Sequence, residues 1–513
     1  MEFLKTFKSA VAVATPIVAV RTADPASTIR TINEAYSQSK PPFATLFWDV
    51  MQGWGGVNKL GQEQSKAVCK NEDPELVSAR PAEALGLLYK YASVYRGEWP
   101  AICFFSNTHL YFKDPQVIQG IWNLRDVLKG KGATLVLLIT AGAYLPPELA
   151  NDVLVLDEPL PTKKDLQSTV VALFASAGLK KPTETETEKA TDALVGLSSF
   201  SAEQTLAMSL TAKGLVIDQL WEKKRKVIEQ TRGLSVWRGG DTFTNIGGCE
   251  NAKTFFTSLL KGVQPPAVVV FMDEIEKMFA GAGTDLSGVK TELLGAFLTW
   301  MEDRKAMGSL FIGPPGSGKT MLGRAIGNEG QILTVGMDVA AMQSSLVGSS
   351  GENFRNGLKV VDAVSGGQPI LVIGTCNSIG SLPPEVRRRF TLGTFFFDLP
   401  TDVERKVIWE KYVKDFGLKN QPIPADGGWT GAEIRNCCQQ AYRLGISLKE
   451  AAGYVIPVAT SAKEQIDRLR ELADGKFISA GKPGTYKREE LESIATPPPA
   501  RVFRVDPSQV GQA

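Results

Sequence analysis

The residues most able to do chemistry lie at positions 313–320, which read Gly-Pro-Pro-Gly-Ser-Gly-Lys-Thr. Their spacing is that of the phosphate-loop motif G-x-x-x-x-G-K-T. Glycines let backbone N–H groups turn toward phosphate oxygens, and a helix N-terminus adds the positive end of its dipole. We expect Lys319 to reach the β- and γ-phosphates of a nucleotide and the Thr320 hydroxyl to bind Mg²⁺. The predicted nucleotide-binding residues are Gly313, Pro314, Pro315, Gly316, Ser317, Gly318, Lys319, Thr320 and Met321.

The segments on either side of this loop are those that the motif requires. Residues 309–312 are strand-like, and residues 321–328 are helix-like. The alternative, a glycine-rich turn that matches the motif by chance, would not be expected to stand between a strand and a helix.

A second motif places two carboxylates at the end of an apolar strand. Residues 267–272 read Ala-Val-Val-Val-Phe-Met, and Asp273 and Glu274 follow. This is a Walker B pattern, in which Asp273 holds Mg²⁺ through water and Glu274 polarises the attacking water. Alone, the pattern also fits a buried strand that leads into a charged turn. Beside a complete phosphate loop it predicts ATP hydrolysis.

Another apolar strand, residues 370–376, ends at Asn377. Ligands of open α/β sheets gather at the carboxyl ends of the strands. Asn377 is therefore expected to orient the water near the γ-phosphate. The alternative is an asparagine that merely ends a strand.

Three consecutive arginines, Arg387, Arg388 and Arg389, follow the sequence Leu-Pro-Pro-Glu at residues 382–385. A basic triplet is most often a solvated surface. In a ring of ATPase subunits, an arginine at this point reaches the γ-phosphate of the neighbouring subunit. Arg387 and Arg389 are the favoured candidates.

Composition limits the function further. The chain has 57 basic and 55 acidic residues among 513, so no strong field attracts nucleic acid. Six cysteines without a C-x-x-C pair and a single histidine, His109, argue against a disulfide framework or a zinc site and fit a reducing, cytoplasmic setting. No apolar run is long enough to span a bilayer. The run from Ala10 to Val20 could pass for a signal peptide, but Pro16 interrupts it and we interpret it as a buried strand.

The pattern along the chain predicts an α/β protein of several units. Apolar strands alternate with helices in residues 1–162, which indicates a parallel sheet covered on both faces. No phosphate loop follows any of those strands. The units expected after it are a helical region, 163–235, with an exposed loop at 182–189, a second α/β unit, 236–400, a helical unit, 401–480, and an extended Pro- and Gly-rich tail, 481–513.

The two α/β units echo each other in sequence. Leu-Pro-Pro-Glu occurs at residues 145–148 and again at 382–385, and each copy is followed by a strand, a Leu-Pro pair and a helix that ends in Gly-Leu-Lys. The matched order suggests two related modules, of which only the second keeps a phosphate loop. Chance similarity of two α/β units is the alternative.

Together these motifs resemble the AAA subgroup of the AAA+ ATPases. Within that resemblance, Ile246, Gly247 and Gly248 correspond to the segment that contacts adenine, and Gly431 and Ala432 to the start of the lid that closes over the nucleotide. The sequence is most similar to the cyanobacterial and plastid family called hypothetical chloroplast reading frame forty-six. Members combine a degenerate RecA-like N-terminal region with one active module. The resemblance implies ATP and Mg²⁺ as cofactors and extends to about Tyr486.

One departure from this family pattern is large. AAA+ proteins normally run phosphate loop, Walker B, sensor 1, but here the Walker B strand precedes the phosphate loop. In the usual sheet order, 5-1-4-3-2, residues 267–272 can still occupy the third-strand position if residues 305–308 and 364–368 span the longer crossovers. We therefore expect an intact site on a rewired five-stranded sheet. Walker B and sensor 1, the strand that ends at Asn377, are normally consecutive in the chain. The transposition therefore affects the coupling between these two segments.

A second departure concerns the channel of the expected ring. Leu346 and Val347 stand where AAA rings place a pore loop, which carries an aromatic residue in many members. An aliphatic loop could still grip a polypeptide by apolar contact, and a plain surface turn is the alternative.

Three functions remain open at the level of sequence. The first is a Mg²⁺-dependent ATPase that works as a ring, expected to be a hexamer, and remodels a protein substrate or partner. The second is a nucleic-acid motor or loader, which the balanced charge disfavours. The third is a nucleotide-gated scaffold or switch with slow hydrolysis.

Overall fold

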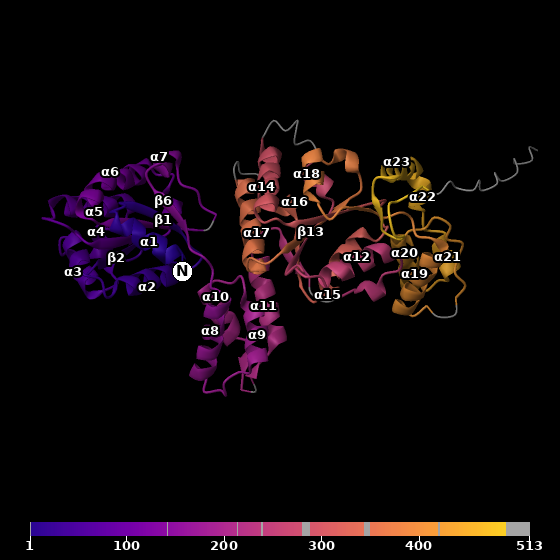
Figure 1. The fold of residues 1–513 in the computed structure, drawn as a ribbon, viewed down its shortest axis with the longest axis horizontal. Helices are drawn as coiled ribbons and strands as arrows, with labels where there is room; N and C mark the ends of the chain where they lie inside the picture. The colour runs from indigo at the N-terminus through magenta and orange to yellow at the C-terminus, as the bar shows by residue number, and fades with distance from the viewer. Residues whose placement is uncertain are drawn as a thin grey trace, which may run out of the picture.

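The computed structural model describes residues 2–140, 142–212, 214–237, 240–279, 288–342, 349–418 and 421–488. Leu346 and Val347 lie outside these ranges. Four units follow one another along the molecule in Figure 1, with the N-terminal sheet at one end and the C-terminal helices at the other. Among the described residues, no helix combines the length and apolar character needed to cross a membrane.

The N-terminal unit is a six-stranded sheet in the order β3-β2-β4-β5-β1-β6, parallel except for β3, which forms a hairpin with β2. Its strands are β1 (Ile17–Arg21), β2 (Ala44–Asp49), β3 (Gly53–Gly56), β4 (Ala101–Phe105), β5 (Thr134–Ile139) and β6 (Leu154–Asp157). Its helices are α1 (Glu2–Ala12), α2 (Pro25–Tyr36), α3 (Lys59–Val68), α4 (Pro74–Val77), α5 (Pro81–Val94), α6 (Pro115–Lys131) and α7 (Pro147–Ala150), with a 3-10 turn at Thr108–Tyr111.

The apolar run at the N-terminus is not one strand, as the sequence analysis interpreted it. Its first residues complete helix α1, and β1 begins only at Ile17. The helix is amphipathic and buries Phe3 and Phe7 against the sheet. Because Pro16 has no N–H to donate, it stands where the chain leaves the helix, and its carbonyl accepts the N–H of Leu135.

A helical region links the two sheets. It consists of α8 (Lys163–Ser176), α9 (Glu184–Leu194), α10 (Ser199–Ala207) and α11 (Ile217–Glu229), with a short hairpin of β7 (Leu210–Thr211) and β8 (Gly214–Leu215). The exposed loop expected at 182–189 is instead the start of α9. Thr183 caps this helix and forms a capping box with Glu186, so the acidic residues favour the first helical turn.

The second sheet has seven strands in the order β15-β14-β11-β13-β10-β12-β9, and all described neighbours are parallel except β9 with β12. The strands are β9 (Leu234–Trp237), β10 (Val268–Met272), β11 (Met307–Ile312), β12 (Leu333–Met337), β13 (Ile370–Cys376), β14 (Thr394–Phe396) and β15 (Ile478–Ser479). The helices are α12 (Glu250–Leu260), α13 (Ile275–Phe279), α14 (Val289–Asp303), α15 (Lys319–Glu329), α16 (Val339–Met342), α17 (Ser349–Ser365) and α18 (Pro384–Arg389), with 3-10 turns at Phe243–Asn245 and Ile379–Ser381.

The two sheets share one arrangement of five parallel strands. It reads β6-β1-β5-β4-β2 in the first and β14-β11-β13-β10-β12 in the second. In the first sheet the strand that matches β10 is β4, which follows β1 in the chain, whereas β10 precedes β11. The repeated Leu-Pro-Pro-Glu follows β5 and β13, which hold the same place in their sheets.

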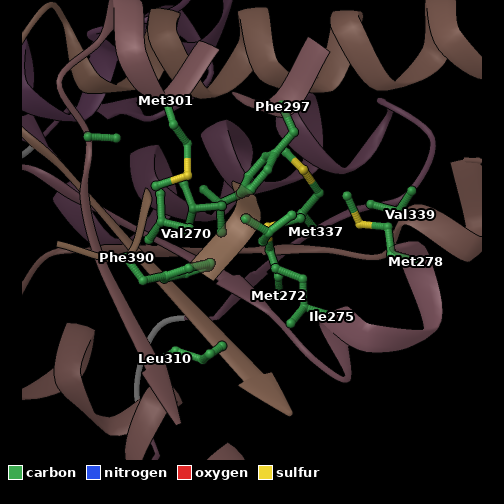
Figure 2. Close-up of a cluster of buried hydrophobic side chains, with 14 of the residues drawn as sticks. Val270, Met272, Ile275, Met278, Phe297, Met301, Leu310, Met337, Val339 and Phe390 are labelled. Atoms are coloured by element: carbon green, nitrogen blue, oxygen red, sulfur yellow. The ribbon is translucent and has the colours of Figure 1, made fainter. Parts of the chain in front are cut away.

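Alternate residues of β10 face the two helical layers that cover the second sheet. Val268, Val270 and Met272 belong to the core beneath α14 and α17, whereas Val269 and Phe271 belong to the core beneath α12 and α15. Figure 2 shows Phe297 and Met301 of α14 directed toward Val270. Several methionines fill this core, because their unbranched side chains adapt to gaps between strand and helix.

The C-terminal helical unit ends in a segment that returns to the sheet. Its helices are α19 (Asp402–Asp415), α20 (Gly431–Leu444), α21 (Leu448–Ala452), α22 (Val458–Ser461) and α23 (Lys463–Ala473). Strand β15 pairs with β14, and residues 481–488, which the sequence analysis assigned to an extended tail, fold back on it. The buried Tyr486 explains the difference, since its ring packs on Phe396 and its hydroxyl donates to Asp398.

Helix α11 buries a charged group. Lys224 is 1% exposed, and its Nζ lies 3.4 Å from the carbonyl of Asp192 and 4.9 Å from the ring centroid of Trp221. Burial lowers the pKa of Lys224 from 10.5 to about 7, and the negative charge of Asp192 offsets part of this shift. Between pH 7 and 10.5, Lys224 is therefore mostly protonated in the unfolded chain and mostly neutral in the folded chain.

We predict that Lys224→Met stabilises the helical region most at low pH. The cost of the buried charge is complete below pH 7 and declines as the pH rises toward 10.5. The gain in Tm should be at least about 4 °C at pH 6.5, from roughly 4–8 °C per kcal/mol for a unit of this size, and should shrink by pH 9.5. Thermal unfolding followed by circular dichroism measures it, with Lys223→Met as the control. Equal shifts for both variants at every pH would contradict the burial argument.

Candidate functional site

A cleft of about 1780 Å³ opens at the carboxyl ends of β10, β11 and β13. The second α/β unit forms one wall, and helices α19 and α20 with residues 479–488 form the other. The carboxyl ends of parallel strands leave free backbone groups and helix N-termini at one edge, where a ligand can bind. Among the described residues, the phosphate loop, the two carboxylates, Asn377 and the two glycine-containing segments line this cleft or touch a residue that lines it.

The phosphate loop bends around the N-terminus of α15. Gly316 and Gly318 have φ angles of +80° and +95°, a region that side-chain-bearing residues rarely adopt. Gly313 is equally constrained, because a Cβ there would lie 2.1 Å from the carbonyl oxygen of Phe397. The loop is thus shaped by backbone geometry before any ligand contributes.

Lys319 is held inside the loop. It is 5% exposed, and its Nζ donates to the carbonyls of Gly313 at 2.7 Å and Pro314 at 2.8 Å. Burial lowers the pKa of Lys319 to about 8, with Glu276 and Asp273 acting in the opposite direction. The ammonium group therefore lies within the curve of the phosphate loop.

The two carboxylates that follow β10 are held by contacts from helices α13 and α15, from β13 and from the residue after β13. Asp273 accepts from the Thr320 hydroxyl at 3.1 Å and from the Thr375 hydroxyl at 2.5 Å. Glu274 has the uncommon φ of +49°, and its side chain accepts from Asn377 Nδ2 at 3.1 Å and pairs with Lys277 Nζ at 2.5 Å. A strand separated by almost 100 residues thus supplies two of these donors.

The residues present suit a magnesium ion. Mg²⁺ prefers hard oxygen ligands, usually one or two carboxylates together with phosphate oxygens and water. Thr320 Oγ1 and Asp273 Oδ1 lie 3.1 Å apart next to the phosphate loop, so this donor set matches. Asp273 and Thr320 would hold the ion, which would neutralise charge on the transferred phosphate.

The residues expected to contact adenine lie on the other side of the loop. Ile246 and Gly247 line the cleft, and Gly247 packs so closely on Ile408 that a Cβ would come within 2.6 Å of its side chain. Gly248 makes a similar approach to the Glu404 side chain. Gly431 and Ala432 also line the cleft, with Ala432 beside Gly316. The two glycine-containing segments are therefore joined through α19 and the phosphate loop.

The arginine triplet is not part of this cleft. Arg387, Arg388 and Arg389 lie on the short helix α18, and none of them is among the described residues that line it. Arg389 donates to Glu302 at 2.6 Å, whereas Arg387 and Arg388 are exposed. Arg435 of α20, in contrast, lines the cleft.

Two functional residues escaped the sequence analysis. Thr375 bonds to the first carboxylate, and Glu276 accepts the backbone N–H of Asn377 at 2.9 Å. A polar residue inside the otherwise apolar β13, one position from its end, was the available signal for Thr375. Glu276 resembled a solvated helix residue, and only the tertiary structure buries it.

Comparison with known proteins agrees with this geometry. Residues 3–158 match the N-terminal domain of SpoVK-like AAA ATPases, and residues 309–365 match the ATPase family associated with various cellular activities, AAA. These two matches support an ATPase of the AAA type. The second match runs from β11 to the end of α17, and the Asp273–Glu274 pair lies before it. The similarity to AAA ATPases implies that this ATPase binds ATP.

The relatives confirm the resemblance drawn from the motifs. The AAA domain-containing protein ycf46 of Guillardia theta is 22% identical to this ATPase over 542 residues, which cover 94% of the chain and 96% of that protein. Its namesake in Trieres chinensis is 23% identical over 414 residues, with 70% and 75% covered. Human ATPase family AAA domain-containing protein 2 is 26% identical over 216 residues, 31% of this chain and 15% of that protein.

We predict that Lys319→Ala removes ATP binding. The ammonium group stands inside the phosphate loop, and each charge-assisted hydrogen bond to a phosphate contributes about 1.5–3 kcal/mol. The Kd of a fluorescent ATP analogue should rise at least about tenfold. Lys406→Ala, which removes an exposed lysine from α19, serves as the control. Unchanged affinity in Lys319→Ala would exclude this loop as the phosphate site.

Proposed function

We propose that this AAA ATPase hydrolyses ATP with Mg²⁺ as a ring of identical subunits and uses the energy to remodel a protein partner. One observation carries the hydrolytic part, namely the position of the Glu274 carboxylate. It contacts Asn377 at 3.1 Å, and the neighbouring Asp273 contacts Thr320 of the phosphate loop. A carboxylate beside the metal-binding pair and an amide is the arrangement that orients and activates water for attack on a γ-phosphate.

The proposed core is an AAA+ sheet with a transposed strand. We assign β14, β11, β13, β10 and β12 to the usual positions 5, 1, 4, 3 and 2, and their observed order supports this. The proposed units are 1–162, a RecA-like domain without a phosphate loop, 163–235, a helical linker, 236–400, the core, and 401–480, a lid over the nucleotide. The returning segment 478–488 extends the lid toward the core.

The ring follows from the separation of the arginines from the cleft of their own chain. An exposed arginine on α18 stabilises the transition state only if it belongs to a neighbouring subunit. Arg389 is engaged with Glu302, so we assign this role to Arg387, with Arg388 as the second choice. A hexamer with Leu346 and Val347 facing its channel is the assembly that we propose for a polypeptide substrate.

Location and partners are assigned on chemical grounds. All six cysteines are free thiols, which supports a reducing compartment such as the cytoplasm. The nearly balanced charge disfavours nucleic acid as the substrate. A slow nucleotide switch is the second candidate, favoured by the ion pair between Glu274 and Lys277, which must open before the carboxylate can act on water.

We predict that Glu274→Gln binds ATP but does not turn it over. The amide keeps the shape of the side chain and loses the base, so kcat should fall at least about 100-fold with Kd for ATP nearly unchanged. Steady-state phosphate release at several protein concentrations measures it. In the wild type the specific rate should rise with concentration, because shared sites form only on assembly. A concentration-independent rate would argue against the ring, and ATP binding without turnover would favour the switch.

We predict that Arg387→Ala loses hydrolysis without losing ATP affinity. An arginine supplied by a neighbour is worth about 10³–10⁵ in kcat, so a loss of at least about 100-fold is expected. Arg389→Ala is the matched control, since it removes only a half-exposed ion pair worth roughly 0–1 kcal/mol. Doping Arg387→Ala into wild type should depress the rate of the mixed assembly. A larger loss in Arg389→Ala would transfer the role to Arg389.

A further inference from the structure

The transposition separates the two strands that must cooperate in hydrolysis. Strand β10 ends at Met272 and β13 begins at Ile370, with β11 and β12 between them in the chain. They are nevertheless neighbours in the sheet, paired from Val268 with Ile370 to Met272 with Gly374. No short connection joins them, so the relative position of Asp273, Glu274 and Asn377 depends on noncovalent contacts at the carboxyl edge.

The Thr375 hydroxyl makes two of these contacts. It lies one position beyond the last residue of β13 that pairs with β10, next to Asp273. Its Oγ1 donates to Asp273 Oδ1 at 2.5 Å and accepts the backbone N–H of Glu274 at 2.9 Å. Thr375 is 1% exposed, so water cannot readily replace the hydroxyl. One side chain thus holds both the proposed metal ligand and the backbone of the proposed base.

Glu276 makes the reverse contact, from the β10 turn to the end of β13. It is 7% exposed, and its Oε1 accepts the N–H of Asn377 at 2.9 Å. Among the described residues no hydrogen-bond donor reaches its Oε2. Burial, followed by the charge of Glu276, raises the pKa of the adjacent Cys376 thiol to about 12. Burying a carboxylate is costly unless hydrogen bonds compensate for lost water, so the bond to the Asn377 N–H is a main contact that stabilises Glu276 in this position.

We propose that Thr375 and Glu276 are positioning residues that hold the Walker B turn and Asn377 in register, in place of the missing short connection. Thr375 fixes the direction of the Asp273 carboxylate and the backbone of Glu274, and Glu276 fixes the backbone of Asn377. Neither residue contacts the reacting atoms. The inference rests on the proposed hydrolysis at Glu274, but its first consequence concerns metal binding, because a hydrogen-bond partner of a metal ligand sets ligand orientation.

The test compares isosteric with conservative variants in the full-length chain. Thr375→Val keeps the shape and removes the hydroxyl, and Thr375→Ser keeps the hydroxyl. The Mg²⁺ concentration that half-saturates binding of a fluorescent ATP analogue should rise at least about tenfold in Thr375→Val and return to within about threefold of wild type in Thr375→Ser. In steady-state assays kcat should fall about tenfold or more, with KM for ATP changed by less than about threefold.

Glu276 is tested in the same manner. Glu276→Gln keeps an oxygen that accepts the Asn377 N–H, whereas Glu276→Ala leaves that N–H without its partner. We expect kcat within about threefold of wild type for Glu276→Gln and at least about tenfold lower for Glu276→Ala, since an unsatisfied buried group is displaced. Thermal unfolding of each variant separates loss of fold from loss of position.

The outcomes distinguish this inference from the proposed function. Equal losses in Thr375→Val and Thr375→Ser, or a wild-type Mg²⁺ requirement in Thr375→Val, would overturn the positioning role even if hydrolysis is established. If the wild type binds ATP without turnover, the proposed hydrolysis fails. The Mg²⁺ dependence of binding then still supports or overturns the role of Thr375. If a variant at one position fails to fold, the pair at the other position decides.

Discussion

The lateral pairing of β10 between β13 and β12 is the interaction on which the rest of the site depends. In a parallel sheet, each strand is held by hydrogen bonds to its neighbours and by helices on both faces. Its place is set by these contacts and not by its position in the chain. The carboxyl end of β10 therefore lies at the same edge as the ends of β11 and β13, and the carboxylates lie beside the phosphate loop.

The opposite wall of the cleft depends on Asp398, which follows β14. Its carboxylate contacts two side-chain nitrogen atoms of Arg470 in α23 and accepts a hydrogen bond from the hydroxyl of Tyr486 in the returning segment. The same segment accepts hydrogen bonds from Asn251 and Ala252 at the start of α12. The sheet, helix α23 and the start of α12 are thus joined, so movement of α23 relative to the sheet must strain or break the Asp398 contacts.

The N-terminal unit has the same strand arrangement, but the carboxyl edge of its sheet contacts helix α17 of the second α/β unit. Tyr144, in the loop after β5, lies 5.7 Å from the guanidinium of Arg21 and 5.1 Å from that of Arg355 in α17. Gly142 approaches Asn356 so closely that a Cβ would lie 2.2 Å from its side-chain oxygen. Where the second sheet forms its cleft, the first packs against a helix of the core. A change in the position of α17 would therefore reach the N-terminal unit directly.

The sequence by itself determined which residues are candidates for the chemistry and which strand or helix adjoins each of them. The phosphate loop, Asp273, Glu274 and Asn377 are recognisable because their spacing from an apolar strand or a helix start is local. The boundaries of β10, β11 and β13 lie close to the expected ranges for the same reason, whereas β9 and β15 fall in stretches that were expected to be largely helical. Local patterns failed where a short segment changes conformation next to a proline or a cap, as at Pro16 and Thr183. Only the tertiary structure decided that β10 pairs with β13, that Thr375 and Glu276 join them, and that Tyr486 returns to the sheet. Each of these features depends on contacts between residues that are far apart in the chain. A local sequence pattern does not predict which distant residues come together at the same edge of a sheet.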